Sequence, residues 1–242
     1  RRRHLTSDAV WAGMGGRSPT AVLFDLDLTL CVSTQAPEEL LAATFERAGV
    51  DPFCEVPDLA AVASETPECE SDREFFAALF DLAAERVDGV DPASVPSSAL
   101  AAAHDALVDH SAVRFRDGAR EALDAALAHG PVGLVTNGGR DTQSTKLDAL
   151  GIADAFDATV FCDPAAGMPP KPDPKPVRVA VDALDVAPDE AVLVGDSKAS
   201  DVAGAHAAGA RSAWVPYDDA SDDGDHDPHH TLDAPENLRD IL

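Results

Sequence analysis

The sequence is poor in lysine, in aromatic residues and in cysteine. Acidic residues outnumber basic ones by 44 to 18, which gives a formal net charge of −26, and only four residues are lysines: Lys146, Lys171, Lys175 and Lys198. A field of that sign repels phosphate backbones and anionic lipids, so we expect no nucleic acid and no membrane surface as a partner. An anionic substrate would therefore need a cation placed locally at its binding site.

The same imbalance indicates a habitat. An excess of Asp and Glu, with few lysines and with aromatic residues at 5%, resembles the composition of proteins from salt-loving organisms. Concentrated salt screens the repulsion between like charges at a protein surface. We therefore expect a halophilic protein that is more stable in molar salt than in dilute buffer.

Other scarcities exclude further classes. The four cysteines form no C-x-x-C pair, so neither a disulfide framework nor a zinc ribbon is expected. No apolar run approaches the roughly 20 residues that cross a bilayer. The start, Arg1-Arg2-Arg3-His4-Leu5, lacks the apolar stretch of a signal peptide. We expect a cytoplasmic protein with a flexible leader over residues 1–18, and nothing in the sequence specifies its oligomeric state.

Short apolar runs alternate with helical patterns along most of the chain. The runs cover residues 21–24, 132–135, 158–161, 191–194 and 212–215, and the helical patterns cover 117–129, 141–150, 174–185 and 199–208. This alternation predicts βαβ units, and hence an α/β fold with a parallel sheet covered by helices on both faces. Ligands of such sheets bind at the carboxyl ends of the strands, and polar residues cluster there in this chain.

The stretch from 33 to 112 breaks the alternation. It contains helical patterns near 37–49, 71–88 and 97–110 and no convincing strand. Because it is far longer than a usual crossover between parallel strands, we interpret 33–112 as an inserted helical cap domain. The core domain would then comprise 19–32 and 113–242. Helices packed on the edge of the sheet are the alternative, and a solvated acidic loop is favoured over a metal site at 216–230.

Two carboxylates follow the first apolar run, in Asp25-Leu26-Asp27-Leu28-Thr29-Leu30. Asp25 can act as nucleophile and metal ligand. Asp27 can protonate the leaving alcohol and then activate the water that completes hydrolysis. Thr29 is a supporting hydroxyl. An Asp-x-Asp alone is a weak signal, because it is also common in turns and helix caps.

Two further groups suit a phosphate. Thr136, Asn137 and Gly138 follow the second run, where a hydroxyl and backbone N–H groups could hold phosphate oxygens. A helix cap with a tight turn is the alternative there. Lys171 lies in Pro169-Pro170-Lys171-Pro172-Asp173-Pro174, whose prolines limit its freedom. It is the local cation that an acidic protein needs for an anionic substrate, although a solvated lysine is the alternative.

A last acidic group follows the run at 191–194, in Gly195-Asp196-Ser197-Lys198-Ala199-Ser200-Asp201. Asp196, together with Asp25 and a backbone carbonyl near Asp27, would coordinate a hard cation such as Mg²⁺.

The neighbours of this acidic group have supporting roles. Asp201 could orient Lys171 or complete the outer shell of the metal, and Ser197 stands beside the metal ligand. A turn that caps the following helix is the alternative for this segment. Phosphoryl transfer explains the four groups together.

These motifs, in this order, resemble the four signature motifs of the haloacid-dehalogenase-like hydrolase superfamily. The segment 25–30 is similar to the nucleophile motif, Thr136 to the second motif, Lys171 to the third, and Asp196 with Asp201 to the fourth. The resemblance implies a Rossmann-like doubly wound core, Mg²⁺ dependence and a covalent aspartyl-phosphate. The inserted stretch is similar to the family's first-type helical cap. Leu28 stands where many relatives have Gly or Asp.

The superfamily that this sequence resembles also contains dehalogenases, phosphonatases and phosphomutases. Relatives that displace halide generally lack the second aspartate, so Asp27 indicates an oxygen leaving group. Phosphonatases use a cap lysine, and 33–112 contains none. We therefore predict a phosphatase for a small phosphate ester. A sugar-phosphate mutase with Arg47, Arg73 and Arg86 as phosphate clamps, and a non-catalytic domain that binds phosphometabolites, are the alternatives.

Overall fold

The computed structural model describes residues 18–67, 69, 71–218 and 224–242. The leader predicted over 1–18 therefore lies outside the described residues, except for Ser18. The chain divides into two compact units, Ser33–Ala112 and the remainder of the chain. Each unit has its own hydrophobic core.

The core unit is built on a six-stranded sheet in the order β5-β4-β1-β6-β7-β8. Every neighbouring pair is parallel, which confirms the prediction of a parallel α/β sheet. The strands are β1 (Ala21–Phe24), β4 (Val132–Asn137), β5 (Ala158–Cys162), β6 (Ala191–Gly195), β7 (Arg211–Trp214) and β8 (His230–Thr231).

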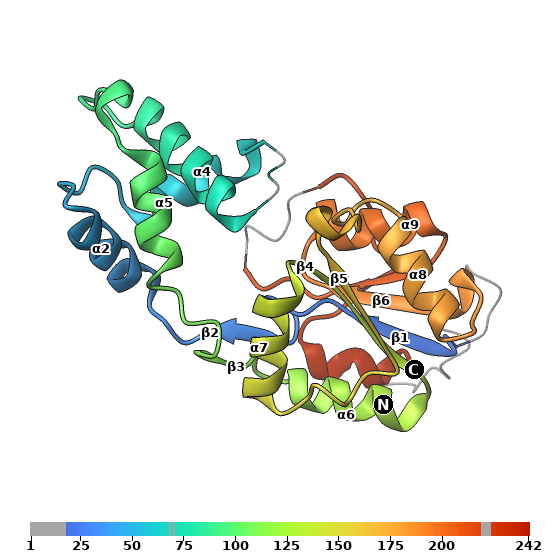
Figure 1. Cartoon of the computed structure of the whole chain (residues 1–242). Coiled ribbons are helices and arrows are strands. Elements are labelled where there is room, and N and C mark those ends of the chain that lie inside the picture. The colour runs from blue at the N-terminus through green and yellow to red at the C-terminus, as the bar shows by residue number, and fades with distance from the viewer. Residues whose placement is uncertain (1–17, 68, 70, 219–223) are drawn as a thin grey trace, which may run out of the picture. The chain divides into compact units, whose positions relative to one another are not determined.

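Side chains of the central strands alternate between two apolar layers. In β1, Val22 and Phe24 belong to one core cluster, whereas Ala21 and Leu23 belong to the other. Helices cover both layers (Figure 1). The first layer is covered by α6 (Ala119–His129), α7 (Arg140–Leu150) and the 3-10 helix η8 (Pro235–Asp240), and the second by α8 (Lys175–Ala183) and α9 (Ala203–Ala208). Because both faces are buried, the strands read as continuous apolar runs in the sequence.

The order of the strands fixes where a ligand can bind. The chain builds the sheet outward from β1 in one direction through β4 and β5, and then in the other direction through β6, β7 and β8. Parallel sheets of this order bind ligands at the point of reversal, outside the carboxyl ends of the strands. Here that point lies between β1 and β6, which are the strands that precede Asp25 and Asp196.

Short elements escaped the sequence analysis. β8 lies at the end of the stretch 216–230, which was predicted to be a solvated loop; that prediction is wrong for this end, because His230 pairs with Ala213 of β7. The nearby His229 Nδ1 accepts a hydrogen bond from the backbone N–H of Ser212 at 3.0 Å. Residues 219–223 of the stretch lie outside the described part of the chain.

Two more strands form a separate small sheet. They are β2 (Cys31–Ser33) and β3 (Val113–Phe115), which lie just before and just after the inserted stretch. Each has only three residues, which is too short for a period-two pattern to be recognised. The helix predicted over 199–208 also differs in detail, because it begins with the π-helical segment η6 (Lys198–Val202) before α9.

The second unit is helical. Its elements are α2 (Pro37–Ala48), α3 (Val56–Val62), η2 (Ala63–Glu65), α4 (Asp72–Arg86), η3 (Pro92–Ser94) and α5 (Ser97–Asp105). Phe45, Phe80 and Leu100 are buried at its centre. The three predicted helices are present, and α3 was missed because it has only two turns. In the described part of the chain, no helix is both long and apolar enough to cross a membrane.

Candidate active site

The side chain of Lys171 is the centre of a buried charge cluster. Its Nζ donates hydrogen bonds of 2.7 Å to Asp25 Oδ1, to Asp201 Oδ1 and to the backbone carbonyl of Val135. An ammonium group has three hydrogen-bond donors, so all of them are used. The exposed fraction of the side chain is 1% for Lys171, 10% for Asp25 and 4% for Asp201. The sequence placed these three residues far apart, and the structure brings them together.

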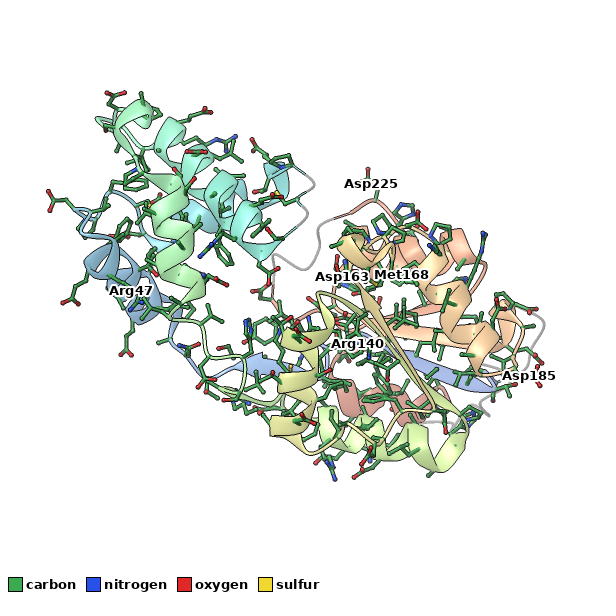
Figure 2. The ribbon with its side chains drawn as sticks, viewed as in Figure 1. Arg47, Arg140, Asp163, Met168, Asp185 and Asp225 are labelled. Carbon is green, nitrogen blue, oxygen red and sulfur yellow. The ribbon has the colours of Figure 1, made fainter. Side chains whose placement is uncertain are left out.

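Lys171 lies in the segment between β5 and α8, and this segment positions it in the cluster. Asp163 begins this loop: its side chain accepts a hydrogen bond from Ala165 N, and its carbonyl accepts one from Met168 N. Figure 2 shows Asp163 and Met168 close together near the end of β5. The backbone of Lys171 is then held by Asn137, whose Oδ1 accepts from Lys171 N at 2.9 Å and whose Nδ2 donates to Lys171 O at 3.2 Å.

Asn137 and Gly138 were predicted to hold phosphate, and the structure gives both another partner. The amide of Asn137 is engaged by the backbone of Lys171 and by Ser200 Oγ at 3.3 Å. The N–H of Gly138 donates to Cys162 O at 3.3 Å. Asn137 therefore holds the backbone of Lys171 in place in this structure.

Asp196 completes the acidic part of the site. It follows β6, and Thr29 Oγ1 donates to its Oδ1 at 3.2 Å. One carboxylate oxygen from each of Asp25, Asp196 and Asp201 lies within 4.8 Å of the other two. Asp201 is fixed by the N–H of Ser197, which donates to its Oδ2 at 3.1 Å. Ser197 Oγ in turn accepts from Ser200 N and begins η6.

Gly195 makes room for this arrangement. A Cβ atom at position 195 would lie 2.2 Å from Cγ of Asp201, which is far inside van der Waals contact. The glycine is thus required by the close approach of Asp201 to the end of β6, and the pattern Gly-Asp in the sequence has a steric cause.

Burial perturbs the acid–base properties of the cluster. For Asp196, burial and the neighbouring charge of Asp201 raise the pKa to about 7. For Asp25, burial raises the pKa to about 8, against the opposing effect of Lys171. Burial disfavours the ammonium of Lys171, but Asp201 and Asp25 outweigh it and hold its pKa above the usual value.

The charges of the cluster suit a divalent cation. Three carboxylates and one ammonium leave a net formal charge of −2 when all are ionised. Carboxylate oxygens are the hard ligands that Mg²⁺ takes in proteins. The donor set therefore fits Mg²⁺, and a bound cation would lower the carboxyl pKa values, because it favours the ionised carboxylates against the effect of burial.

Thr136 presents an unused hydroxyl at the end of β4. Its Oγ1 is buried and has no hydrogen-bond partner among the residues that the structure describes. Leaving such a group unpaired costs about 1–3 kcal/mol. A phosphate oxygen would supply the missing partner, which is the role that the sequence predicted for Thr136.

The carboxylate of Asp27 lies outside the acidic cluster. It contacts two residues of α7 that the sequence analysis did not select, Lys146 and Gln143. The side chain of Asp27 is 43% exposed, in contrast to that of Asp25. Lys146 could have been noticed, since it is one of only four lysines, but no local pattern pointed from it to Asp27.

Arg116 is another residue that sequence reasoning missed. Its guanidinium donates to the backbone carbonyls of Leu28 at 2.7 Å and of Val215 at 2.9 Å. It thereby ties the loop after β1 to the loop after β7. Leu28 has a φ of 59°, in the left-handed region where a side chain is disfavoured. This conformation explains why Gly or Asp would suit the position.

Comparison with known proteins supports one family. The model of the haloacid dehalogenase-like hydrolase family matches residues 22–215. A phosphoglycolate phosphatase of Rhodospirillum rubrum is 34% identical over 204 residues, which is 82% of this chain and 80% of that protein. A phosphoserine phosphatase of Thermus thermophilus is 45% identical over 82 residues, and there the match covers 34% of this chain and only 32% of that protein.

A solved structure gives the same result for the fold. The HAD-hydrolase YfnB from Bacillus subtilis, solved bound to magnesium, aligns over 93% of this chain and 99% of its own, with a TM-score of 0.70 and 18% sequence identity. The family model covers most of the chain, and it includes every residue of the charge cluster. This protein belongs to the haloacid dehalogenase-like hydrolase family.

Proposed function

We propose that this protein is a Mg²⁺-dependent phosphatase that hydrolyses a small phosphorylated metabolite through an aspartyl-phosphate on Asp25. The observation that carries the proposal is the buried cluster of Asp25, Lys171, Asp196 and Asp201 at the reversal point of the sheet. The unpaired hydroxyl of Thr136 supports it. The relatives named as phosphatases support it as well.

In the first step, a carboxylate oxygen of Asp25 attacks phosphorus, and the bond from phosphorus to the ester oxygen breaks. Lys171 keeps the nucleophile in place through Asp25 Oδ1 and contributes positive charge near the phosphoryl group. Thr136 donates to a phosphoryl oxygen. Asp27, once protonated, gives its proton to the leaving alkoxide.

In the second step, Asp27 takes a proton from water as the water attacks phosphorus. The bond between phosphorus and Asp25 breaks, which releases inorganic phosphate and restores the carboxylate. Asp25, Asp196 and the backbone carbonyl of Asp27 would hold Mg²⁺, while Asp201 keeps Lys171 oriented. When bound, the cation neutralises charge on the phosphoryl group and so favours attack by a carboxylate.

The helical unit Ser33–Ala112 is proposed to be the cap that selects the substrate. None of its residues belongs to the four motifs, so this unit can determine which leaving group is accepted without altering the chemistry. The substrates named for the relatives, phosphoglycolate and phosphoserine, define the class to be screened first: small, strongly anionic phosphate esters.

A phosphomutase needs the same Asp25 and Asp27 and a clamp for a second phosphate. Two of the arginines considered for that clamp are already paired on the surface of the helical unit: Arg73 with Asp105 at 3.6 Å, and Arg86 with Glu65. Each pair would have to open before its arginine could bind a second phosphate. Release of phosphate, without an isomerised product, would separate the two reactions.

The direct test is hydrolysis of p-nitrophenyl phosphate with Mg²⁺, at low salt and in molar KCl, by the parent protein and by Asp25→Asn. We expect the parent to release phosphate and Asp25→Asn to lose all detectable turnover. Asp154→Asn, which removes an exposed carboxylate elsewhere in the core unit, is the matched control. If the parent is inactive in both salts, or if Asp25→Asn is as active as the parent, the proposal fails.

A structural test complements the kinetics. Beryllium fluoride with Mg²⁺ should form an adduct on Asp25, because it imitates a phosphoryl group attached to a carboxylate. An adduct on any other residue, or none at saturating fluoride, would contradict the assignment of Asp25 as nucleophile.

A further inference from the structure

Asp27 is held on both of its oxygens by one face of α7. Lys146 Nζ lies 2.8 Å from Asp27 Oδ1 and 2.7 Å from Oδ2, and Gln143 Nε2 donates to Oδ2 at 3.0 Å. Gln143 and Lys146 are three residues apart in the helix, so their side chains leave it on the same side. Two donors on a rigid element thus fix the direction of the carboxylate.

Gln143 also connects this contact to the phosphate side of the site. Its Nε2 donates to the backbone carbonyl of Asn137 at 3.0 Å, at the end of β4. A Cβ atom at Gly138 would lie 2.3 Å from the same nitrogen. Gln143 is only 2% exposed, so its position is determined by packing as well as by hydrogen bonds.

Stability does not account for the pair between Lys146 and Asp27. Ordering a lysine side chain costs roughly 1.5–2 kcal/mol of rotamer entropy. Ion pairs with an exposed partner contribute only about 0–1 kcal/mol. The side chain of Asp27 is 43% exposed, whereas that of its partner Lys146 is only 15% exposed. By contrast, Lys175 is exposed and donates to the carbonyl of Gly167, without a carboxylate partner in the described structure.

We propose that Lys146 and Gln143 are positioning residues for the proton transfers of Asp27, and that this pair fixes the orientation from which Asp27 reaches the ester oxygen and the attacking water. The inference rests on the proposed function. An unrestrained aspartate would exchange among staggered rotamers, of which only some direct the carboxylate at the reaction. Neither residue touches the substrate; both act through Asp27.

The test compares two esters that differ in their need for an acid. Nitrophenolate leaves readily without a proton, whereas the alkoxide of glycerol phosphate does not. In rapid-quench measurements of the first turnover, we expect Lys146→Met to slow glycerol phosphate by about 10- to 100-fold, a part of the 10²–10⁴ that general acid catalysis contributes. The rate with p-nitrophenyl phosphate should fall less than about threefold, and KM for both esters should change little.

Three controls separate positioning from a loss of structure. Lys146→Arg, whose guanidinium can hold both oxygens, should recover part of the rate with glycerol phosphate. Lys175→Met should behave like the parent with both esters. In an Asp27→Asn background, Lys146→Met should cause no further loss, because residues that act through one group are not additive.

The inference is overturned if Lys146→Met slows both esters equally, or if it slows glycerol phosphate by the same factor with and without Asp27. A crystal structure of Lys146→Met that keeps the Asp27 carboxylate in its original place would also overturn it. These failures leave turnover by the parent and its loss in Asp25→Asn untouched. An inactive parent, in contrast, removes the proposed function and this inference together.

Discussion

Lys171 is buried at a position where no single charge would be tolerated. A lysine ammonium removed from water is strongly disfavoured, and so are the carboxylates of Asp25 and Asp201. Each becomes acceptable because the others are present at 2.7 Å. The same contacts limit the motion of Asp25, the proposed nucleophile, because the ammonium that holds it has no remaining donor with which to rearrange.

Replacement of Lys171 should therefore damage stability as well as activity. We expect Lys171→Met to lower the free energy of unfolding by about 3–5 kcal/mol, because two buried carboxylates lose their cation. Urea denaturation measures this. Adding Asp201→Asn to Lys171→Met removes one of the two buried carboxylates that have lost their cation. The double variant should therefore be more stable than Lys171→Met alone. A loss below about 1 kcal/mol for the single variant would show that the cluster is not held by this charge.

The sequence identified Asp25 and Asp196 because each lies at the end of an apolar run, and Lys171 because it is a scarce lysine between prolines. Asp25 and Asp196 end strands, and parallel strands bring their ends together whatever the details of packing. The partners of Asp27 could not be found in this way. Lys146 is 119 residues from it along the chain, and which face of α7 meets the loop after β1 depends on packing that no local period encodes.

At the scale of elements, long periodic segments were predictable and short ones were not. The five buried strands were visible as apolar runs, whereas β2, β3 and β8 have two or three residues each. Steric requirements were also invisible in the pattern. In the sequence, Gly195 looks like one more apolar residue at the end of β6. Only the structure shows that Asp201 occupies the space that a side chain at position 195 would need.

The junction between β6 and η6 should therefore reject even a methyl group. We expect Gly195→Ala to cost about 1–3 kcal/mol through overpacking and to displace Asp201 from Lys171, which would lower kcat. Gly139→Ala is a suitable control, because a Cβ atom there would meet nothing closer than 3.9 Å. Equal stability and equal kcat for Gly195→Ala and the parent would contradict this account of the junction.

For the whole molecule, stability should depend on pH through the acidic cluster. The folded-state pKa of Asp196, about 7, is above its value in an unfolded chain, about 3.9. The folded state then binds more protons, so the free energy of unfolding should fall as pH rises from about 4 to 7 when no metal is bound.

Mg²⁺ should oppose this loss, because it favours the ionised carboxylates. The increase in Tm caused by saturating Mg²⁺ should be larger at pH 8 than at pH 6, and Asp196→Asn should reduce the difference. Because other groups can also contribute to the pH dependence of the parent, the comparison between the parent and Asp196→Asn decides. An identical pH dependence in both proteins would show that Asp196 does not couple metal binding to stability.

The surface charge leads to the last prediction. With 44 acidic and 18 basic residues, at least 26 acidic residues cannot each have a basic partner of their own. Their repulsion opposes the compact state and acts over the Debye length, which shrinks from about 10 Å at 0.1 M salt to about 3 Å at 1 M. We expect the urea midpoint to rise steeply between 0.05 and 1 M KCl and to level off beyond it, because screening is then nearly complete. Sucrose, which is uncharged, should not reproduce the steep part, and an unfolding midpoint independent of KCl would refute the halophilic interpretation.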